Sequence, residues 1–247
     1  MAGFLSKRFT DAVKAVNYLL WPRRCGICGQ YVTEETGHLC SLCWQRFGMA
    51  AASDYCPSCG TDVSQYAVIN GKCPQCDDMS LCFDNIVRIG SYQDVLRDMI
   101  LAIKHAERPE LTELLGYQLY CAANSKLPLD QIELFVPVPL HWRRRLFRGY
   151  NQTSRIAQSF ADHGLNVRNV LIRKKYTSPQ PGLDYRQRAK NVRGAFKCAS
   201  PHLINGATVC LIDDIKTSGA TLSECARVLK SSGAAKVYAA VIAVAHQ

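Results

Sequence analysis

The stretch that decides the fold reads TVCLIDDIKTSGAT and runs from Thr208 to Thr221. Its first five residues, Thr208 to Ile212, form a β-branched apolar run without alternation, which is typical of a strand buried on both faces of a parallel sheet. Two carboxylates, Asp213 and Asp214, follow where this strand is expected to end. A helix and a second apolar strand, residues 237–244, come next, so the stretch predicts a strand, turn, helix and strand unit.

The turn after the acidic pair is small, rich in hydroxyl groups and contains a glycine. Its residues are Lys216, Thr217, Ser218, Gly219, Ala220 and Thr221. Main-chain amides of such a turn can approach an anion at the positive end of a helix dipole, so the turn predicts a phosphate cradle at a helix starting near Leu222. Paired carboxylates suit the vicinal hydroxyls of a ribose, at roughly 1.5 to 3 kcal/mol for each charge-assisted hydrogen bond. The alternative is an ordinary capped turn in which Thr221 and Glu224 form a capping box.

This stretch resembles the phosphoribosyl-pyrophosphate (PRPP) signature of type I phosphoribosyltransferases, in which the strand, the paired acids and the T-S-G-A-T turn occur in this order. It is neither a Walker A loop nor a GxGxxG turn. The resemblance implies an α/β fold with a type I phosphoribosyltransferase-like parallel sheet flanked by helices. It also implies that PRPP or a related ribose phosphate binds with Mg²⁺. Asp213 and Asp214 would be catalytic and PRPP-binding residues, and the turn from Lys216 to Thr221 would complete the site.

Four CxxC pairs precede this domain. They are Cys25/Cys28, Cys40/Cys43, Cys56/Cys59 and Cys73/Cys76. Eleven residues separate the first pair from the second, and thirteen separate the third from the fourth. These spacings are close to the zinc-ribbon pattern, in which two knuckles converge on one tetrahedral Zn²⁺. The simplest assignment is sequential, with four cysteines on each of two structural zinc ions, and interleaved pairing stays open. A segment with so few large apolar residues needs the metal, which supplies about 10 to 16 kcal/mol in zinc fingers.

Composition and patterning bound the rest of the chain. The 247 residues fit one α/β domain with a small appendage, and we expect an amphipathic helix over 1–22, a double zinc ribbon over 23–80 and the phosphoribosyltransferase-like domain over 81–247. A secretory h-region and an apolar run of about 18 residues are both lacking, so a transmembrane segment is not expected. The expected location is a reducing cytoplasm, with a peripheral position at the inner membrane as an alternative for the basic N-terminal helix.

A strongly basic segment lies between residues 143 and 197, which hold fourteen lysines and arginines and two aspartates. It follows an apolar strand, residues 134–139, and a guanidinium-rich loop after a strand can hold pyrophosphate oxygens in bidentate fashion. The predicted loop residues are Arg143, Arg145, Arg148, Gly149 and Asn151. A solvated basic turn or an RNA-binding arginine cluster is the alternative. Residues 174–193 contain too little apolar content to pack rigidly, and a plain disordered loop is one of the structures considered for them.

The CxxC pairs, the V-P-V-P strand end, the R-R-x-x-R-G-Y-N-Q loop and the PRPP turn together resemble the ComF/GntX family of bacterial competence and DNA-utilisation proteins, from Cys25 nearly to the C-terminus. The resemblance implies a role in DNA uptake, natural transformation and use of exogenous DNA, with single-stranded DNA and proteins of the uptake machinery as partners. It further implies a hood over PRPP, in which the matching residues are Thr177, Gln180, Leu183, Arg188 and Asn191.

Catalysis by this site stays open at the level of sequence. In a phosphoribosyltransferase the reaction would displace pyrophosphate from C1 of the ribose through an oxocarbenium-like transition state. No segment of the sequence indicates a pocket for the acceptor. Two alternatives therefore remain beside a role in DNA uptake. One is a housekeeping phosphoribosyltransferase with an unknown acceptor, and the other is a non-catalytic zinc-ribbon adaptor for nucleic acid. The sequence does not indicate whether the basic segment contacts DNA or only pyrophosphate. It gives no indication of the oligomeric state.

Overall fold

A four-stranded parallel sheet is the centre of the computed structural model, which describes residues 22–33, 37–105, 108, 110–141, 151–175 and 185–245. The strand order is β1-β6-β5-β2, and every neighbouring pair is parallel. The strands are β1 (Asn85–Ser91), β2 (Leu134–Pro137), β5 (Thr208–Lys216) and β6 (Lys236–Val244). Residues 209–212 of β5 and 237–244 of β6 are apolar and buried, because both faces of these strands are covered.

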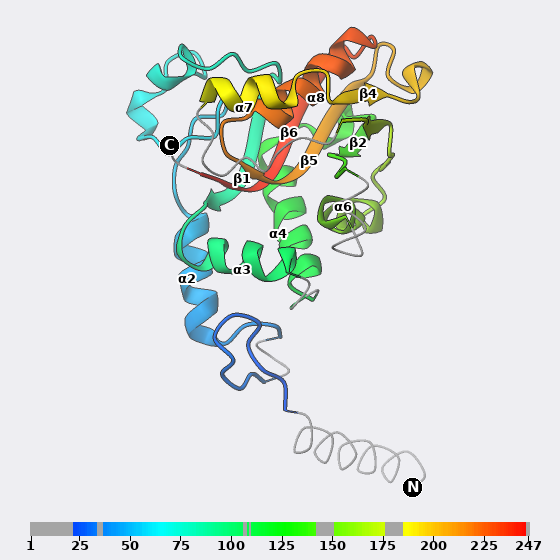
Figure 1. Cartoon of the computed structure of the whole chain (residues 1–247). Coiled ribbons are helices and arrows are strands. Elements are labelled where there is room, and N and C mark those ends of the chain that lie inside the picture. Colours follow the sequence, from blue (N-terminus) through cyan, green and yellow to red (C-terminus); the bar gives the residue numbers. More distant parts are fainter. Residues whose placement is uncertain are drawn as a thin grey trace, which may run out of the picture.

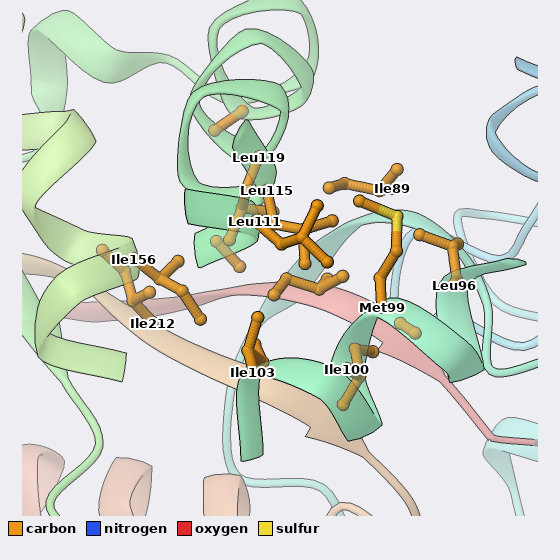
Figure 2. Packing of buried hydrophobic residues seen from close by; sticks show 14 of the residues in the cluster. Ile89, Leu96, Met99, Ile100, Ile103, Leu111, Leu115, Leu119, Ile156 and Ile212 are labelled. Carbon is orange, nitrogen blue, oxygen red and sulfur yellow. The ribbon is translucent and has the colours of Figure 1, made fainter. Parts of the chain in front are cut away.

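Helices cover both faces of the sheet (Figure 1). Helices α3 (Asp94–Lys104), α4 (Glu110–Lys126) and α6 (Gln152–Asp162) pack on one face. Helix α8 (Ala220–Ser231) packs on the other, with α7 (Tyr185–Val192) beside it and the antiparallel hairpin β3 (Leu171–Arg173) and β4 (Phe196–Cys198) next to it. Figure 2 shows the first of these cores, where Ile212 of β5 lies opposite Ile156 of α6 and near Ile103 of α3.

The two cysteine-rich segments pack on different parts of this body. The first leads into α2 (Ser41–Ala51), and Cys25, Cys43 and Phe47 belong to the same core as α3 and α4. The second lies along the outer edge of β1, where the Ile86 N–H donates to the Pro57 carbonyl oxygen at 2.8 Å and the Arg88 N–H to the Tyr55 hydroxyl at 3.4 Å. Figure 1 shows them well separated, with α2 between them. The division of the chain at residue 80 stays a prediction.

A buried arginine fastens the second segment to β1. The Arg88 side chain forms an ion pair with Asp62, donates to the Ser53 and Ser91 hydroxyls at 3.1 Å, and lies over the Tyr55 ring. Burial lowers the pKa of Arg88 to about 10. The side chain stays cationic at neutral pH, so the network joins the second segment to the sheet by charge as well as by main-chain hydrogen bonds.

The predicted α/β class, a parallel sheet flanked by helices, is confirmed, and two local predictions are wrong. Strand β5 extends four residues beyond Ile212, because β6 pairs with it as far as Lys216 and Val244, so the acidic pair lies within the strand. Helix α8 begins at Ala220, in agreement with the predicted start near Leu222. Part of the predicted loop over 174–193 is the helix α7, and Val192 at its end is buried. In the described ranges no helix is long and apolar enough to cross a lipid bilayer.

Glycine at position 90 is required by the close approach of α2 to β1. A Cβ at Gly90 would lie 2.3 Å from the Ala50 carbonyl oxygen and 2.7 Å from the Leu96 Cδ1 atom. Gly90→Ala is therefore expected to lower the free energy of unfolding by about 1 to 3 kcal/mol, measured by denaturant titration in the presence of zinc. Gly48→Ala in α2 is the matched control, because a Cβ there meets nothing within 4 Å and alanine is favoured in a helix by about 0.5 to 1 kcal/mol. Equal effects of the two substitutions would contradict this packing.

Candidate functional site

Asp213 and Asp214 lie side by side near the carboxyl end of β5. The main-chain N–H of Asp214 donates to Asp213 Oδ1 at 2.9 Å, and Asp214 Oδ2 lies 3.0 Å from the Lys104 Nζ atom. Burial, followed by the negative charge of Asp214, raises the pKa of Asp213 well above its usual value, while Lys104 and Arg173 oppose the rise. Ionisation of both carboxyl groups is therefore unfavourable, and a bound cation would favour the doubly ionised pair.

The turn that follows forms the N-terminus of α8. Gly219 is the N-cap residue with φ of +77°, and the Ser223 N–H donates to its carbonyl oxygen at 2.8 Å. A Cβ at Gly219 would lie 2.9 Å from the Leu81 Cδ2 atom and 3.1 Å from the Lys216 Cε atom, so both the backbone angle and the space require glycine. The capping box considered for Thr221 and Glu224 is not formed, because the cap lies at Gly219.

Glu224 instead connects α8 with the end of α7. Its carboxylate accepts a hydrogen bond from the Gly194 N–H at 2.7 Å and is held by the Arg227 guanidinium at 2.7 and 2.8 Å. The hydrogen bond from Arg227 lowers the pKa of Glu224, and burial opposes this. The ionised carboxylate thus fixes the start of the α7–β4 connection to the helix that begins at the turn.

The side chain of Lys216, a residue that the signature implies as ligand-binding, is buried in the structure. It is 2% exposed, and its Cε atom lies 3.1 Å from the position that a Cβ at Gly219 would occupy. Burial lowers the pKa of Lys216. The hydrogen-bonding groups of the turn are provided by residues 217–221 and by the main chain of Lys216.

The strand that precedes the predicted arginine loop ends next to the residue before the acidic pair. Strand β2 is the neighbour of β5, and the Val138 N–H donates to the Ile212 carbonyl oxygen at 2.9 Å. Arg143, Arg145, Arg148 and Gly149 lie outside the described residues. Asn151 is described as the N-cap residue of α6, and its side chain is hydrogen-bonded to Ser154 at 2.9 Å and Thr153 at 2.8 Å. Its role in the loop stays a prediction.

The predicted hood is described only in its second half. Thr177, Gln180 and Leu183 lie outside the described residues. Arg188 and Asn191 lie in α7, which packs against α8, the helix that starts at the turn. The structure thus brings Arg188 to the same face of the sheet as the turn, and its contact with a ligand stays a prediction.

Sequence reasoning missed two cations near the acidic pair. Lys104 ends α3 and forms the ion pair with Asp214. Arg173 ends β3, lies over the Phe196 ring and exerts its positive charge on Asp213. The sequence holds no local signal for either residue, because each is brought to β5 by packing of an element distant in the chain. A general expectation that buried carboxylates acquire cationic neighbours is the only guide.

The eight predicted cysteines form two compact clusters in sequential order. The four cysteine sulfur atoms of residues 25–43 lie within 4.8 Å of one another, and so do the four of residues 56–76. The pairing that the sequence left open is therefore sequential. Distances of 3.6 Å between Cys28 and Cys40, and of 3.5 Å between Cys59 and Cys73, are close to the separation of about 3.8 Å that a tetrahedral ZnS₄ centre with Zn–S bonds of about 2.3 Å requires. Both clusters fit structural Zn²⁺.

Each cluster starts with the same glycine-containing turn. The Gly29 N–H donates to the Cys25 carbonyl oxygen at 3.0 Å, and the Gly60 N–H to the Cys56 carbonyl oxygen at 2.7 Å. The two glycines have φ of +74° and +78°. Although burial alone would raise it, hydrogen bonds from main-chain N–H groups lower the pKa of Cys25 to about 6. Burial raises the pKa of Cys43, so metal binding would release protons from the cluster.

Comparison with known proteins agrees with these two clusters and with the rest of the chain. Residues 16–79 match the double zinc ribbon domain family. Among solved structures, a glutamine PRPP amidotransferase from B. subtilis, complexed with ADP and GMP, is similar with a TM-score of 0.39 and 18% identity. That likeness covers 57% of the present chain and 30% of the amidotransferase chain, and nothing about its ligands extends to this protein.

The similarity to curated bacterial proteins covers most of the sequence. DNA utilization protein YhgH of Salmonella typhi is 28% identical over 224 residues, which are 87% of this chain and 94% of that protein. Competence protein ComFC of Bacillus subtilis is 24% identical over 223 residues, 88% and 83% of the two chains. Competence protein F of Haemophilus influenzae is 30% identical over 220 residues, 87% of this chain and 93% of that protein. The chain therefore belongs to the family of competence protein F and the YhgH proteins.

Proposed function

We propose that this protein binds PRPP with Mg²⁺ at the carboxyl end of β5 and acts in DNA uptake and the use of exogenous DNA. The observation that carries the proposal is the adjacency of the two carboxylates, Asp213 and Asp214, to the glycine-capped N-terminus of α8. One end of this short stretch suits sugar hydroxyls and the other suits a phosphate. The names of the relatives, which refer to competence and DNA utilization, support the biological role.

Different residues of the site would bind different parts of the ligand. Asp213 and Asp214 would accept hydrogen bonds from the two ribose hydroxyls, and the main-chain N–H groups of residues 217–221 would donate to the 5′-phosphate. Carboxylate oxygens are ligands that Mg²⁺ prefers, and the ion when bound would neutralise charge on the pyrophosphate. If pyrophosphate leaves C1, the same carboxylates would stabilise the positive charge that develops on the sugar. Lys104 would hold Asp214 in place through its ion pair.

Contact with single-stranded DNA is the second part of the proposal. The excess of lysine and arginine between residues 143 and 197 exceeds what one pyrophosphate needs, and a positive segment of this size attracts a polyanion. Proteins of the uptake machinery would be further partners, and the site of action would be the cytoplasm, with a peripheral position at the inner membrane. A zinc-ribbon adaptor that binds only nucleic acid is the competing function, and it too would use this segment.

Calorimetric titration of the zinc-loaded protein with PRPP tests the first part. We expect saturable binding of one PRPP per chain that requires Mg²⁺, with weaker binding of ribose 5-phosphate because the pyrophosphate contacts are lost. The titration is repeated with single-stranded DNA present, which should change the PRPP affinity if both act in one process. Absence of heat and of a thermal shift at millimolar PRPP would rule the proposal out.

The same protein preparation separates DNA contact from small-molecule binding. A protein that neutralises six to ten phosphates loses about 10³ to 10⁵ in affinity between 50 and 200 mM salt. We expect such a loss for an oligonucleotide in fluorescence anisotropy, and a much smaller one for PRPP. PRPP binding without salt-sensitive DNA binding would leave a phosphoribosyltransferase with an unknown acceptor as the function.

A further inference from the structure

Asp214, one of the two acids at the proposed sugar site, is paired with a cation of the chain itself. Its Oδ2 atom lies 3.0 Å from the Lys104 Nζ atom, and the two side chains are only 16% and 23% exposed. Solvent screens an ion pair weakly when both partners are largely buried, and either charge alone would be costly to bury. A ligand that binds beside Asp214 therefore meets a carboxylate whose charge Lys104 already balances.

The two acids of the site face opposite sides of the sheet. Successive side chains of a strand point to opposite faces. In β5, Leu211 belongs to the core beneath α8, and Ile212 belongs to the core beneath α3, α4 and α6. The alternation places Asp213 on the side of α8 and Asp214 on the side of α3, which is the helix that provides Lys104. Lys104 is thus positioned to support Asp214 in particular.

This arrangement assigns one ribose hydroxyl to each acid. Helix α8 begins at Ala220 and packs on the Asp213 side of the sheet, and the 5-phosphate would bind at its N-terminus. In a ribose ring the hydroxyl on C3 is nearer to C5 than the hydroxyl on C2 is. Asp213 would therefore accept a hydrogen bond from the C3 hydroxyl, and Asp214 would accept one from the C2 hydroxyl, beside Lys104.

The position of Lys104 lowers the cost of a missing C2 hydroxyl. A site that binds a substrate hydroxyl rejects the analogue without it by about 10⁴- to 10⁵-fold when a buried polar group of the site is left unpaired. Asp214 is not left unpaired, because the Lys104 ammonium group stays within hydrogen-bond distance. The loss is then limited to one hydrogen bond, which corresponds to about tenfold in affinity or less.

We propose that the sugar site accepts 2-deoxyribose 5-phosphates as well as ribose 5-phosphates, and that Lys104 is the residue that makes it tolerant of the missing hydroxyl. This specificity rests on the proposed binding of a ribose phosphate and names the class of sugar that the site takes. The sugar of DNA is 2-deoxyribose, but within a strand its C3 hydroxyl is esterified and is not available to Asp213. The ligand is therefore a monomer with a free C3 hydroxyl.

Calorimetric displacement with the parent chain tests the specificity. Ribose 5-phosphate and 2-deoxyribose 5-phosphate are titrated separately into the zinc-loaded protein saturated with PRPP and Mg²⁺, and we expect their affinities to agree within about tenfold. The 3-deoxyribose 5-phosphate isomer is the matched control, and we expect it to bind at least about 100-fold more weakly, because Lys104 lies on the side of Asp214. Rejection of the 2-deoxy sugar by more than about 100-fold, or equal affinity for all three sugars, would overturn the proposal.

Three variants test whether Lys104 is the cause. Lys104→Met keeps much of the stem and removes the charge, so the preference for ribose over 2-deoxyribose should rise to about 100-fold or more. Lys104→Arg keeps the charge and should show a preference close to that of the parent. Lys230→Met is the matched control, because it removes a lysine that lies 2.8 Å from Asp84 Oδ1 in a similar ion pair, with side chains 35% and 33% exposed. An unchanged preference in Lys104→Met would overturn the role of Lys104. The preference of the parent decides the sugar class even if Lys104→Met does not fold.

The same titrations separate failure of this specificity from failure of the proposed function. A parent chain that binds neither PRPP nor ribose 5-phosphate would refute the proposed function, and the sugar specificity would fall with it. Binding of PRPP that neither sugar phosphate displaces would show that the hydroxyls contribute little, which overturns the specificity and leaves PRPP binding intact. Displacement by ribose 5-phosphate alone would likewise overturn only the specificity.

Discussion

Substitution of both Asp213 and Asp214 by asparagine is expected to abolish PRPP binding and to leave the chain folded. Each carboxylate would provide a charge-assisted hydrogen bond to a ribose hydroxyl, and such bonds contribute about 1.5 to 3 kcal/mol each, or roughly tenfold to hundredfold in affinity. Asparagine keeps the shape of the side chain and removes the charge that would attract Mg²⁺. Calorimetric titration of the single and double variants measures the loss. Asp98→Asn, which removes an exposed acid on α3, is the matched control and should bind as the parent does.

The stability of Asp213→Asn gives a second readout with a definite sign. The pKa of Asp213 is raised in the folded protein, so the folded state binds this proton more tightly than the unfolded state does. The parent consequently loses stability as the pH rises through the usual carboxyl range. Asparagine removes this loss, so the variant is expected to melt no lower than the parent at neutral pH, and the difference should shrink in acid. A variant that melts much lower, or that binds PRPP like the parent, would contradict the assignment.

Cys59→Ser is expected to remove the second zinc ion and to unfold the second ribbon without unfolding the sheet. The buried cluster there consists of Cys56, Cys59 and Cys73, with only a few partly buried apolar neighbours. Apolar burial of this extent cannot replace a metal that supplies about 10 to 16 kcal/mol in zinc fingers. We expect the zinc content to fall from two ions to one, and the amides of residues 53–82 to lose protection in hydrogen-exchange mass spectrometry.

Two observations make this expectation specific. The exposed Cys121 lies on α4 outside both clusters, and Cys121→Ser should keep two zinc ions and full protection. In Cys59→Ser, amides of β5 and β6 should keep their protection, because both strands are buried between helices on the two faces. Retained protection over residues 53–82 after loss of the zinc ion would show that the ribbon folds without its metal.

The sequence predicted the fold and the zinc ligands where the signal is local. The apolar run before Asp213 has the composition of a strand buried on both faces, and the CxxC spacing fixes which cysteines can share a metal. It did not predict the length of β5, because the last residues of this strand are held by pairing with β6 rather than by their own composition. The helix α7 was missed for a similar reason, since its packing depends on α8.

The surroundings of the site were less accessible to sequence reasoning. Lys104 and Arg173 lie far from β5 in the chain, and only packing brings their charges to the acidic pair. The burial of the Lys216 side chain was not predictable either, because the motif places this residue in a ligand-binding turn, whereas the structure buries its side chain. Local patterns thus pointed to the candidate residues of the site, whereas they gave no indication of the distant residues that set its electrostatics.

The position of the second ribbon along β1 also protects the molecule from its own sheet. Strand β1 is the last strand on its side, and the outward N–H groups of Ile86 and Arg88 are taken up by Pro57 and Tyr55. An uncovered strand edge offers its hydrogen-bonding groups to other chains and promotes aggregation. Loss of zinc at this ribbon would therefore have a cost beyond local unfolding, because it would free an edge onto which the β1 strand of another molecule could add.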